Sequence, residues 1–476
     1  MNPPRLVGIL GDSLGDPYSV RIVEGLCRRF ARHGMSLVGF AGGFPTAPYF
    51  LTEDGKVKLP SGLDAFVLLS ETLEDCTHHL ISAIAASDGP IVSVGAELPG
   101  AASVLVNDEI GVYQAVTHLV KRHNCSRIAF IAGPKRSSEA TRRLKAYQAA
   151  LEDLDLDWDP ALLARGDYEA RSGREAVLDL RQRSAQPFDA IVSANDLMAI
   201  GAIDGVKAIG MRVPEDVKII GFDDTPEASF VQPTLTTVRQ PIFEQGATAA
   251  DLVLAMLAHE RAQDRTLNST ALVVRRSCGC SGSEVPPQQQ SRTEQDRELV
   301  DQAFRGMIRQ QLAARRRHSE LLRIGDAIVC AEGFQELATA VTRVFRLLGQ
   351  SRFLLCIYAG NKRHVRVVLE SRGREVVYKN QPESFPIERL LPSGFIKPGV
   401  FIQLMVEPLQ VADDHLGFYV METDDLDPQV HLELRHLLSS ALARIFGVRE
   451  LRRLYSMEKK YAELTRNLEP SGDDRS

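Results

Sequence analysis

Polar residues directly follow several short apolar runs of this sequence, at places where a side chain could bind a small molecule. Asn195 and Asp196 follow IVSA, Asp223 and Asp224 follow KIIGF, and Asp12 follows LVGILG. Their amide and carboxylate groups include both donors and acceptors of hydrogen bonds, which a small polar ligand needs. Such residues between a strand and a helix are also common as structural caps and turns. Both interpretations stay open at each position, and Asn195 or Asp196 could cap the helix that follows.

The elements around these residues repeat as strand and helix. From residue 5 to about residue 280, apolar runs such as RLVGILG, AFVLLS and RIAFIAG alternate with segments of helical periodicity. Repeated strand–helix units predict parallel sheets covered by helices on both faces, and two such sheets fit this length. In this fold class the carboxyl ends of the strands face a ligand crevice. The polar residues are therefore expected along such a crevice.

The composition is that of an ordinary soluble protein of about two or three domains. The chain has 476 residues, of which 44% are hydrophobic and 25% charged, and its formal net charge is −6. A net negative charge argues against a dedicated nucleic-acid-binding chain. An odd number of cysteines does not predict a secreted disulfide framework, and no apolar stretch has the length of a membrane span. We therefore expect a cytoplasmic protein without membrane contact.

The second half of the chain has a different organisation. Ser, Pro and Gln are frequent after residue 281, and residues 282–330 are expected to form a linker and a long amphipathic signalling helix. Residues 331–447 show a helix, a series of antiparallel strands and a closing helix, which predicts an α+β domain. Residues 448–476 carry a short heptad pattern that predicts a coiled-coil helix and favours a homodimer.

Several segments of residues 1–281 resemble one protein family. VNDEIGVYQAVTHLV, ANDLMAIGAIDGVKAIGMRVPEDVKIIGFDDT and PTLTTVRQP are similar to the ligand-binding core of the LacI/GalR family of bacterial transcriptional regulators. That core is itself similar to periplasmic sugar-binding proteins. The resemblance implies a two-lobed α/β fold that binds a small polar ligand, of sugar or nucleoside type, between its lobes. It also implies a role in transcription regulation.

The resemblance also assigns candidate ligand contacts. Arg143 in RLKAY, Asn195 in SAND, Asp223 in GFDD and Gln240 in TVRQP match polar ligand contacts of the family. Planar side chains of these types hold donors and acceptors in fixed directions, which suits sugar hydroxyls, and Tyr18 offers a flat apolar face to a sugar ring. The full set of predicted ligand-binding residues is Asp12, Asp16, Tyr18, Arg143, Tyr168, Asn195, Asp223 and Gln240.

The sequence departs from the family at its N-terminus. A helix-turn-helix normally precedes this core, whereas here the first strand begins a few residues after Met1. We therefore expect that module to be absent, which puts direct DNA binding by the usual route in doubt. Residues 331–447 resemble a GAF-like module in the order of their elements, as in relatives whose core is fused to signalling domains.

Two other functions stay open. One is a ligand-independent interaction adaptor that recruits a separate DNA-binding or kinase partner. The other is the input half of a two-component or cyclic-dinucleotide signalling system. No Ser-His-Asp, paired-carboxylate or phosphate-loop arrangement stands out, so no catalytic residue is predicted and the chain is not expected to be an enzyme.

One cysteine motif could bind a metal. Cys278 and Cys280 flank Gly279 in RRSCGC and could supply two thiolates. Zinc normally takes four ligands, and no second Cys or His pair lies nearby in the sequence, although a dimer could supply four. We therefore expect a structural strand end at this motif, with no metal and no cofactor.

Overall fold

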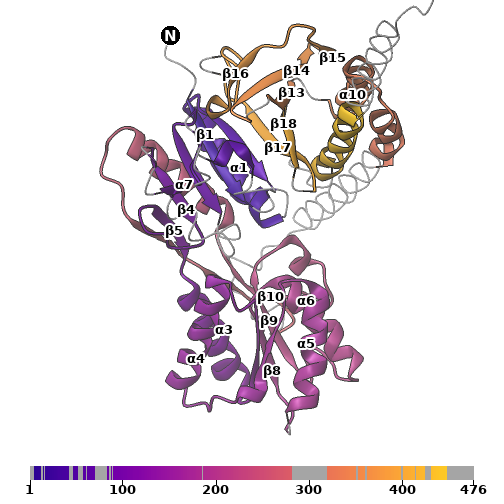
Figure 1. The fold of residues 1–476 in the computed structure, drawn as a ribbon. Helices are drawn as coiled ribbons and strands as arrows, with labels where there is room; N and C mark the ends of the chain where they lie inside the picture. Colours follow the sequence, from indigo (N-terminus) through magenta and orange to yellow (C-terminus); the bar gives the residue numbers. More distant parts are fainter. Residues whose placement is uncertain are drawn as a thin grey trace, which may run out of the picture.

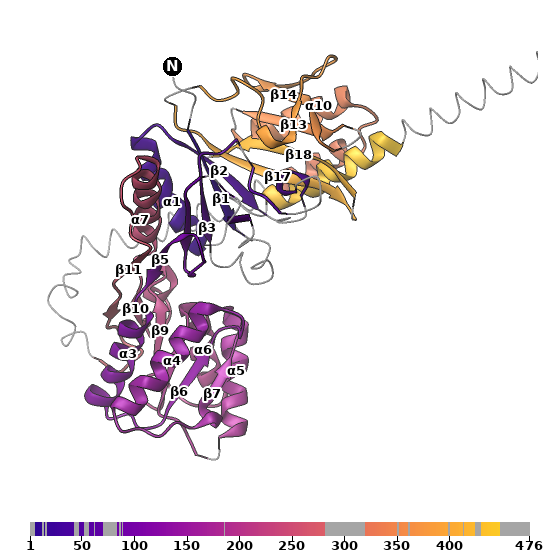
Figure 2. The same cartoon turned by 60° about the vertical axis from the view of Figure 1, so that its left-hand side comes forward.

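The fold consists of a two-lobed domain, residues 5–280, and a C-terminal domain, residues 319–447 (Figure 1, Figure 2). We call the two-lobed domain the sensor domain, after the ligand-binding role expected from the sequence. The computed structural model describes residues 5–11, 14, 17–41, 47–51, 57–60, 62–69, 83–84, 87, 89–184, 186–280, 319–349, 352–359, 362–397, 400–412, 414–423 and 430–447.

Lobe 1 contains parallel strands in the order β11-β5-β4-β3-β1-β2. They are β1 (Leu6–Gly11), β2 (Ser36–Ala41), β3 (Ala65–Leu69), β4 (Ile91–Val94), β5 (Ala102–Val106) and β11 (Arg265–Asn268). Two helices, α1 (Pro17–Arg32) and α7 (Ile242–Leu257), share one hydrophobic core with these strands. The helices approach so closely at Gly25 and Gly246 that an added Cβ would meet the backbone of the other helix.

Lobe 2 contains a second sheet in the order β12-β10-β9-β8-β6-β7. Its strands are β6 (Ile128–Ala132), β7 (Leu163–Arg165), β8 (Ala190–Ser193), β9 (Lys218–Asp223), β10 (Thr236–Arg239) and β12 (Ala271–Val273). Its helices are α3 (Asp108–His123), α4 (Ser138–Asp153), α5 (Ala170–Arg183) and α6 (Asp196–Ala208). Figure 1 shows α3 and α4 on one side of the sheet and α5 and α6 on the other. Burial on both faces explains why β6 is an uninterrupted apolar run and why β8 is apolar up to its last residue, Ser193.

The chain passes between the lobes at residues 106–108, 239–242 and 268–271. Each of the first two passages follows the carboxyl end of a strand, β5 in lobe 1 and β10 in lobe 2. The carboxyl ends of the two sheets therefore face each other. The predicted two-lobed α/β fold is confirmed, but the prediction of purely parallel sheets is wrong, because β12 pairs antiparallel with β10.

The C-terminal domain contains antiparallel strands in the order β17-β18-β13-β14-β15, with β16 paired to β14. Its elements are α10 (Phe334–Leu348), β13 (Phe353–Tyr358), β14 (His364–Arg372), β15 (Glu375–Tyr378), β16 (Ser384–Pro386), β17 (Gln403–Val411) and β18 (Asp414–Glu422). Helical segments at 319–329 and 430–447 share a core with α10 and one face of these strands. The sequence did not indicate the short strand β16.

The two domains share one continuous sheet, which the sequence did not predict. Strand β17 pairs in parallel with β2, the edge strand of lobe 1, and Met405 lies opposite Gly39 in this register. Successive residues of β17 point to opposite faces. Leu404 and Val406 enter a core shared with lobe 1, whereas Met405 joins the core under α1 and α7. Lobe 1 and the C-terminal domain are thus joined by backbone hydrogen bonds and by shared packing.

Some predictions lie outside the described residues. Of the linker and signalling helix at 282–330, only residues 319–330 are described, and these are helical up to residue 329. The coiled coil predicted for 448–476 lies wholly outside, as do Asp12 and Asp16. Among the described helices, none combines the length and apolar character needed to cross a membrane.

Shortening Leu404 should destabilise the joined sheet. The side chain is 0% exposed, so Leu404→Ala is expected to lower the free energy of unfolding by about 2–5 kcal/mol, through lost burial and the cavity left behind. Urea unfolding followed by circular dichroism measures this change. Val411→Ala, at the exposed end of the same strand, is the control and should stay within about 0.5 kcal/mol of the wild type. Equal effects of the two substitutions would contradict the shared core.

Candidate functional site

Asn195 and Asp196 make different contacts, and the sequence had left open which of them caps α6. Asn195 is the N-cap of α6, since its Oδ1 accepts a hydrogen bond from the Met198 N–H at 2.9 Å. Its Nδ2 donates to the carbonyl oxygen of Tyr168 at 2.8 Å, which ties it to a second predicted residue. Asp196 is fully buried and accepts hydrogen bonds from Thr225 N–H and the Thr237 hydroxyl. Asp196 therefore joins α6 to the sheet, and Asn195 both caps the helix and lies at the candidate site.

Arg143, on α4, is the centre of the site. Its side chain is 2% exposed, and its guanidinium lies 3.8 Å from the centre of the Phe222 ring. Nε donates to Oδ1 of Asp108 at 2.8 Å, and Nη1 donates to the Ala194 carbonyl oxygen at 2.7 Å. Among the described residues, Nη2 is buried without a hydrogen-bond partner. The guanidinium is thus fixed by its neighbours with one nitrogen still able to donate.

Three carboxylates surround this guanidinium. Besides Asp108, Glu139 Oε2 lies 3.6 Å from Nη2, and Asp223 Oδ1 lies 4.0 Å from Nη1. Burial alone would lower the pKa of Arg143, but the three carboxylates together raise it above its ordinary value. Burial raises the pKa of Asp223 to about 7, against the opposing effect of Arg143, and burial also raises the pKa of Glu139. The site therefore holds three carboxyl groups around Arg143, and the pKa values of two of them, Asp223 and Glu139, are raised.

Asp223 and Gln240 are adjacent at the carboxyl ends of β9 and β10. Gln240 Nε2 donates to Asp223 Oδ1 at 2.6 Å, and Gln240 Oε1 accepts from Gln245 Nε2 at 3.3 Å. Asp224 instead pairs with Arg239 and with Arg275, away from Arg143. Only the first of the two consecutive aspartates therefore belongs to the site.

Tyr168 lies beside Arg143 because a glycine makes room for it. An added Cβ at Gly133 would lie 2.5 Å from Cζ of the Tyr168 ring. The Tyr168 hydroxyl lies 2.9 Å from the Ser137 hydroxyl, the N-cap of α4, and its backbone is in the left-handed region at φ 71°. The structure thus places Tyr168 next to Asn195, which it binds through its carbonyl oxygen, and near the charge of Arg143.

Lobe 1 contributes Tyr18, near the start of α1. Its hydroxyl lies 3.5 Å from Oε1 of Glu139 in lobe 2. A second contact between the lobes is made by Arg142, whose Nη2 donates to the Gly95 carbonyl oxygen at 3.1 Å while its Nε binds Asp108 at 2.9 Å. These contacts join lobe 1 directly to the charge cluster of lobe 2, which consists of Asp108, Glu139, Arg142 and Arg143.

The structure adds residues that sequence reasoning missed, chiefly Asp108, Glu139 and Phe222. Glu139 precedes Arg143 by four positions on α4, a spacing that places two side chains on one helix face and could have indicated the pair. Asp108 lies in the first turn of α3, where an acidic residue is ordinarily explained by the helix dipole alone. No comparable signal marks Phe222.

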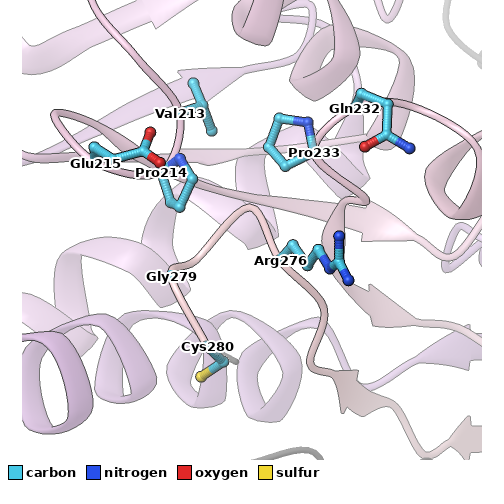
Figure 3. Close-up of a pocket in the computed structure, with 8 residues that line it drawn as sticks. All are labelled: Val213, Pro214, Glu215, Gln232, Pro233, Arg276, Gly279 and Cys280. Carbon is cyan, nitrogen blue, oxygen red and sulfur yellow. The ribbon is translucent and has the colours of Figure 1, made fainter. Parts of the chain in front are cut away.

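A surface hollow of lobe 2 involves none of the predicted ligand-binding residues (Figure 3). It lies where the chain leaves the sensor domain. Its lining residues are Val213, Pro214, Glu215, Gln232, Pro233, Arg276, Gly279 and Cys280.

A group of side chains with metal-ligand chemistry also lies apart from Arg143. His118, His123, Cys278 and Cys280 each direct one ligand atom to a common place, and these atoms lie within 4.8 Å of one another. The expectation that no second Cys or His pair lies near the cysteine motif is therefore wrong in three dimensions. Helix α3 supplies the missing pair across a long sequence separation.

Comparisons with known proteins concern the sensor domain. Residues 116–278 match the model of the periplasmic binding protein-like domain. The chain is similar to the HTH-type transcriptional repressor PurR of Aliivibrio fischeri (strain MJ11), with 25% identity over 280 residues, 58% of this chain and 81% of that protein. It is also similar to the HTH-type transcriptional regulator CelR of Thermobifida fusca, with 35% identity over 171 residues, 36% of this chain and 50% of that protein. These relatives are transcriptional regulators rather than enzymes, and the match spans half the length of CelR.

Solved structures show the same two-lobed fold. The CelR–cellobiose complex matches with a TM-score of 0.51 and 27% identity, over 58% of this chain and 86% of that one. The Lac repressor dimer bound to operator and the anti-inducer ONPF matches with a TM-score of 0.50 and 25% identity, over 58% of this chain and 94% of that one. The periplasmic-binding-protein-like fold expected from the sequence is thus confirmed.

Replacing Arg143 by a neutral side chain should destabilise lobe 2. Arg143→Met leaves buried carboxylates without their cation and is expected to lower the free energy of unfolding by about 3–5 kcal/mol. The single tryptophan, Trp158, lies in lobe 2 beside Tyr147, so its fluorescence in urea reports this change. Arg171→Met, which removes an exposed arginine paired with Glu175, is the control and should leave the urea midpoint of unfolding unchanged. An unchanged urea midpoint for Arg143→Met would contradict the claim that this cation stabilises the buried carboxylates.

The stability of lobe 2 should depend on the ionisation of Asp223. The pKa of this carboxyl rises from 3.8 to about 7 on folding, so the folded state binds more protons between these values. Stability contributed by Asp223 is therefore lost as the pH rises from about 4 to about 7, by up to about 1.4 kcal/mol per pH unit. Asp223→Asn should flatten this dependence, which is measured as the free energy of unfolding at each pH. Parallel pH profiles of the two proteins would contradict the raised pKa.

Proposed function

We propose that this chain, which contains a LacI-family, periplasmic-binding-protein-like ligand-binding domain, is a ligand-responsive transcription regulator. It binds one small polar molecule of sugar or nucleoside type between its lobes. The observation that carries this proposal is the buried guanidinium of Arg143, which keeps an unused donor, Nη2, among carboxylates that accept hydrogen bonds. A buried donor without a partner is costly, and a ligand hydroxyl would relieve that cost.

The remaining residues supply what a polyhydroxy ligand needs. Asp223 and Glu139 accept hydrogen bonds, Asn195 and Gln240 hold amide groups in fixed positions, and the aromatic ring of Tyr18 approaches from lobe 1. Cellobiose, named in the CelR complex, has this chemistry. The guanidinium of Arg143 already faces three carboxyl groups, so the site offers no unpaired cation to an anionic ligand, which favours a neutral, hydroxyl-rich one.

The signal passes from the sensor domain through the shared sheet. Lobe 1 is joined to the C-terminal domain by the pairing of β2 with β17, whereas lobe 2 touches lobe 1 through Tyr18 and Arg142. A ligand that binds the closed arrangement more tightly moves lobe 2 relative to the unit formed by lobe 1 and the C-terminal domain. In this proposal the C-terminal domain is a GAF-like signalling module, and residues 282–330 and 448–476 form helices that pair in a cytoplasmic homodimer.

A thermal-shift panel of pentoses, hexoses, disaccharides and nucleosides tests the function. A ligand present at 100 times its dissociation constant should add about 2.7 kcal/mol to the stability of the sensor domain and raise its melting temperature by several degrees. Asp223→Asn should abolish the shift, since it replaces a carboxyl oxygen beside Arg143 by an NH2 group that cannot accept a hydrogen bond. Asp204→Asn, which changes an exposed aspartate of α6, is the matched control and should keep it.

Two results would count against the proposal. A shift of equal size in Asp223→Asn would show that the ligand binds elsewhere. A flat panel at millimolar ligand would favour an adaptor that acts without a small molecule and recruits a DNA-binding or kinase partner.

A further inference from the structure

We propose that His118, His123, Cys278 and Cys280 form a tetrahedral zinc site that fastens the last residues of the sensor domain to α3. The two histidines come from the second half of α3, and the two cysteines come from the segment that follows β12. Cys278 is 0% exposed and Cys280 is 6% exposed, whereas the histidines are half-buried. Neither cysteine forms a disulfide.

The distances between the ligand atoms are those of a tetrahedral site. With Zn–N near 2.0–2.1 Å and Zn–S near 2.3 Å, a regular tetrahedron places two nitrogens about 3.4 Å apart and a nitrogen and a sulfur about 3.6 Å apart. Nε2 of His118 lies 3.3 Å from Nε2 of His123. The distances from His118 Nε2 to the sulfurs of Cys278 and Cys280 are 3.4 and 3.5 Å, and that from His123 Nε2 to Cys280 is 3.4 Å.

Hydrogen bonds alone do not account for this cluster. Nε2 of His118 has three ligand-type atoms within 3.3–3.5 Å, on both cysteines and on His123. A ring nitrogen carries either one proton or one lone pair, so it makes one strong hydrogen bond rather than three. Four donor atoms that converge on one point are what a shared cation produces.

Local structure holds each ligand in place. The backbone at Gly279 has φ 94°, a region that favours glycine, and this turn lets both neighbouring cysteines face α3. In Figure 3 the sulfur of Cys280 points away from Pro233, toward the helices at the bottom of the view. The preceding residue, Ser277, donates to the Ile219 carbonyl oxygen and accepts from the Thr236 N–H at 2.8 Å, which fixes the segment to the sheet.

The chemistry of the ligands selects the metal. Two thiolates and two imidazoles in a tetrahedral arrangement suit Zn²⁺, whereas Mg²⁺ and Ca²⁺ require oxygen ligands. Four protein ligands leave no position for water or substrate, so the site is structural rather than catalytic. The Thr236 hydroxyl lies 3.1 Å from Cys278 Sγ and would donate to the metal-bound thiolate, an outer contact that is typical of such sites.

The position of the zinc site indicates its structural role. Residue 280 is the last described residue before the chain leaves the sensor domain, and α3 begins with Asp108, which holds Arg143. Zinc would therefore anchor the exit of the chain to the same helix that positions the ligand site. This anchor does not depend on the identity of the small-molecule ligand.

Metal analysis of the full chain tests the site. Protein purified without chelators should contain about one zinc ion per chain, and the double variant Cys278→Ser/Cys280→Ser should contain at least about tenfold less. Cys125→Ser is the matched control, since Cys125 is buried beside His123 but does not belong to the group, and it should retain the zinc.

A second measurement on the wild type covers the case in which the double variant does not fold. Zinc is removed with a chelator under reducing conditions, and cobalt(II) is added in its place. The expected result is intense visible absorption typical of tetrahedral cobalt, a thiolate-to-cobalt charge-transfer band, and protection of two thiols from alkylation. Absence of zinc together with absence of these bands would overturn the proposal, and so would a disulfide between Cys278 and Cys280 in freshly isolated protein.

Discussion

The parallel pairing of β2 with β17 is the constraint on which the arrangement of the molecule depends. The edge of lobe 1 would otherwise present unpaired backbone groups to solvent, and β17 covers that edge. The pairing is reinforced by side chains, because Tyr49 of lobe 1 meets Phe418 of the C-terminal domain with ring centres 5.7 Å apart. Lobe 1 and the C-terminal domain therefore form one unit, and lobe 2 is the part that a ligand moves in the proposed function.

The charge cluster of lobe 2 is where such a movement would begin. Asp108 binds two consecutive arginines, of which Arg143 turns inward to the site and Arg142 reaches the Gly95 carbonyl oxygen of lobe 1. Glu139 also makes a contact between the lobes, because its Oε1 lies 3.5 Å from the Tyr18 hydroxyl. Closing or opening the lobes therefore changes the surroundings of the buried charges, which links the electrostatics of the ligand site to the position of lobe 2.

Residues at the ends of strands could be predicted from the sequence, because the topology of parallel sheets brings those ends together. Asn195 and Asp223 were found in this way, whereas Gln240 came only from the resemblance, and all three lie around Arg143. Contacts between distant segments could not be predicted. His118 and Cys278 are 160 positions apart, and nothing in helical periodicity shows which face of α3 meets the end of the sensor domain.

The sheet shared by lobe 1 and the C-terminal domain could not be predicted from the sequence, for a related reason. The apolar run at the start of β17 indicates a strand with two buried faces, but it does not say which edge that strand will pair with. The run was therefore consistent with a separate domain. The backbone pairing of β17 with β2, together with the placement of Leu404 and Met405 in two different cores, shows that lobe 1 is the partner.

Distance measurements between spin labels test most directly whether a ligand moves lobe 2 relative to the unit formed by lobe 1 and the C-terminal domain. Labels at the exposed positions Glu152 in lobe 2, Arg32 in lobe 1 and Arg372 in the C-terminal domain report the two relevant separations, after Cys330 is replaced by serine. With a saturating ligand from the thermal-shift panel, the account predicts that the separation between positions 32 and 152 changes while that between positions 32 and 372 does not. A ligand that leaves the first separation unchanged, or that alters the second, would contradict it.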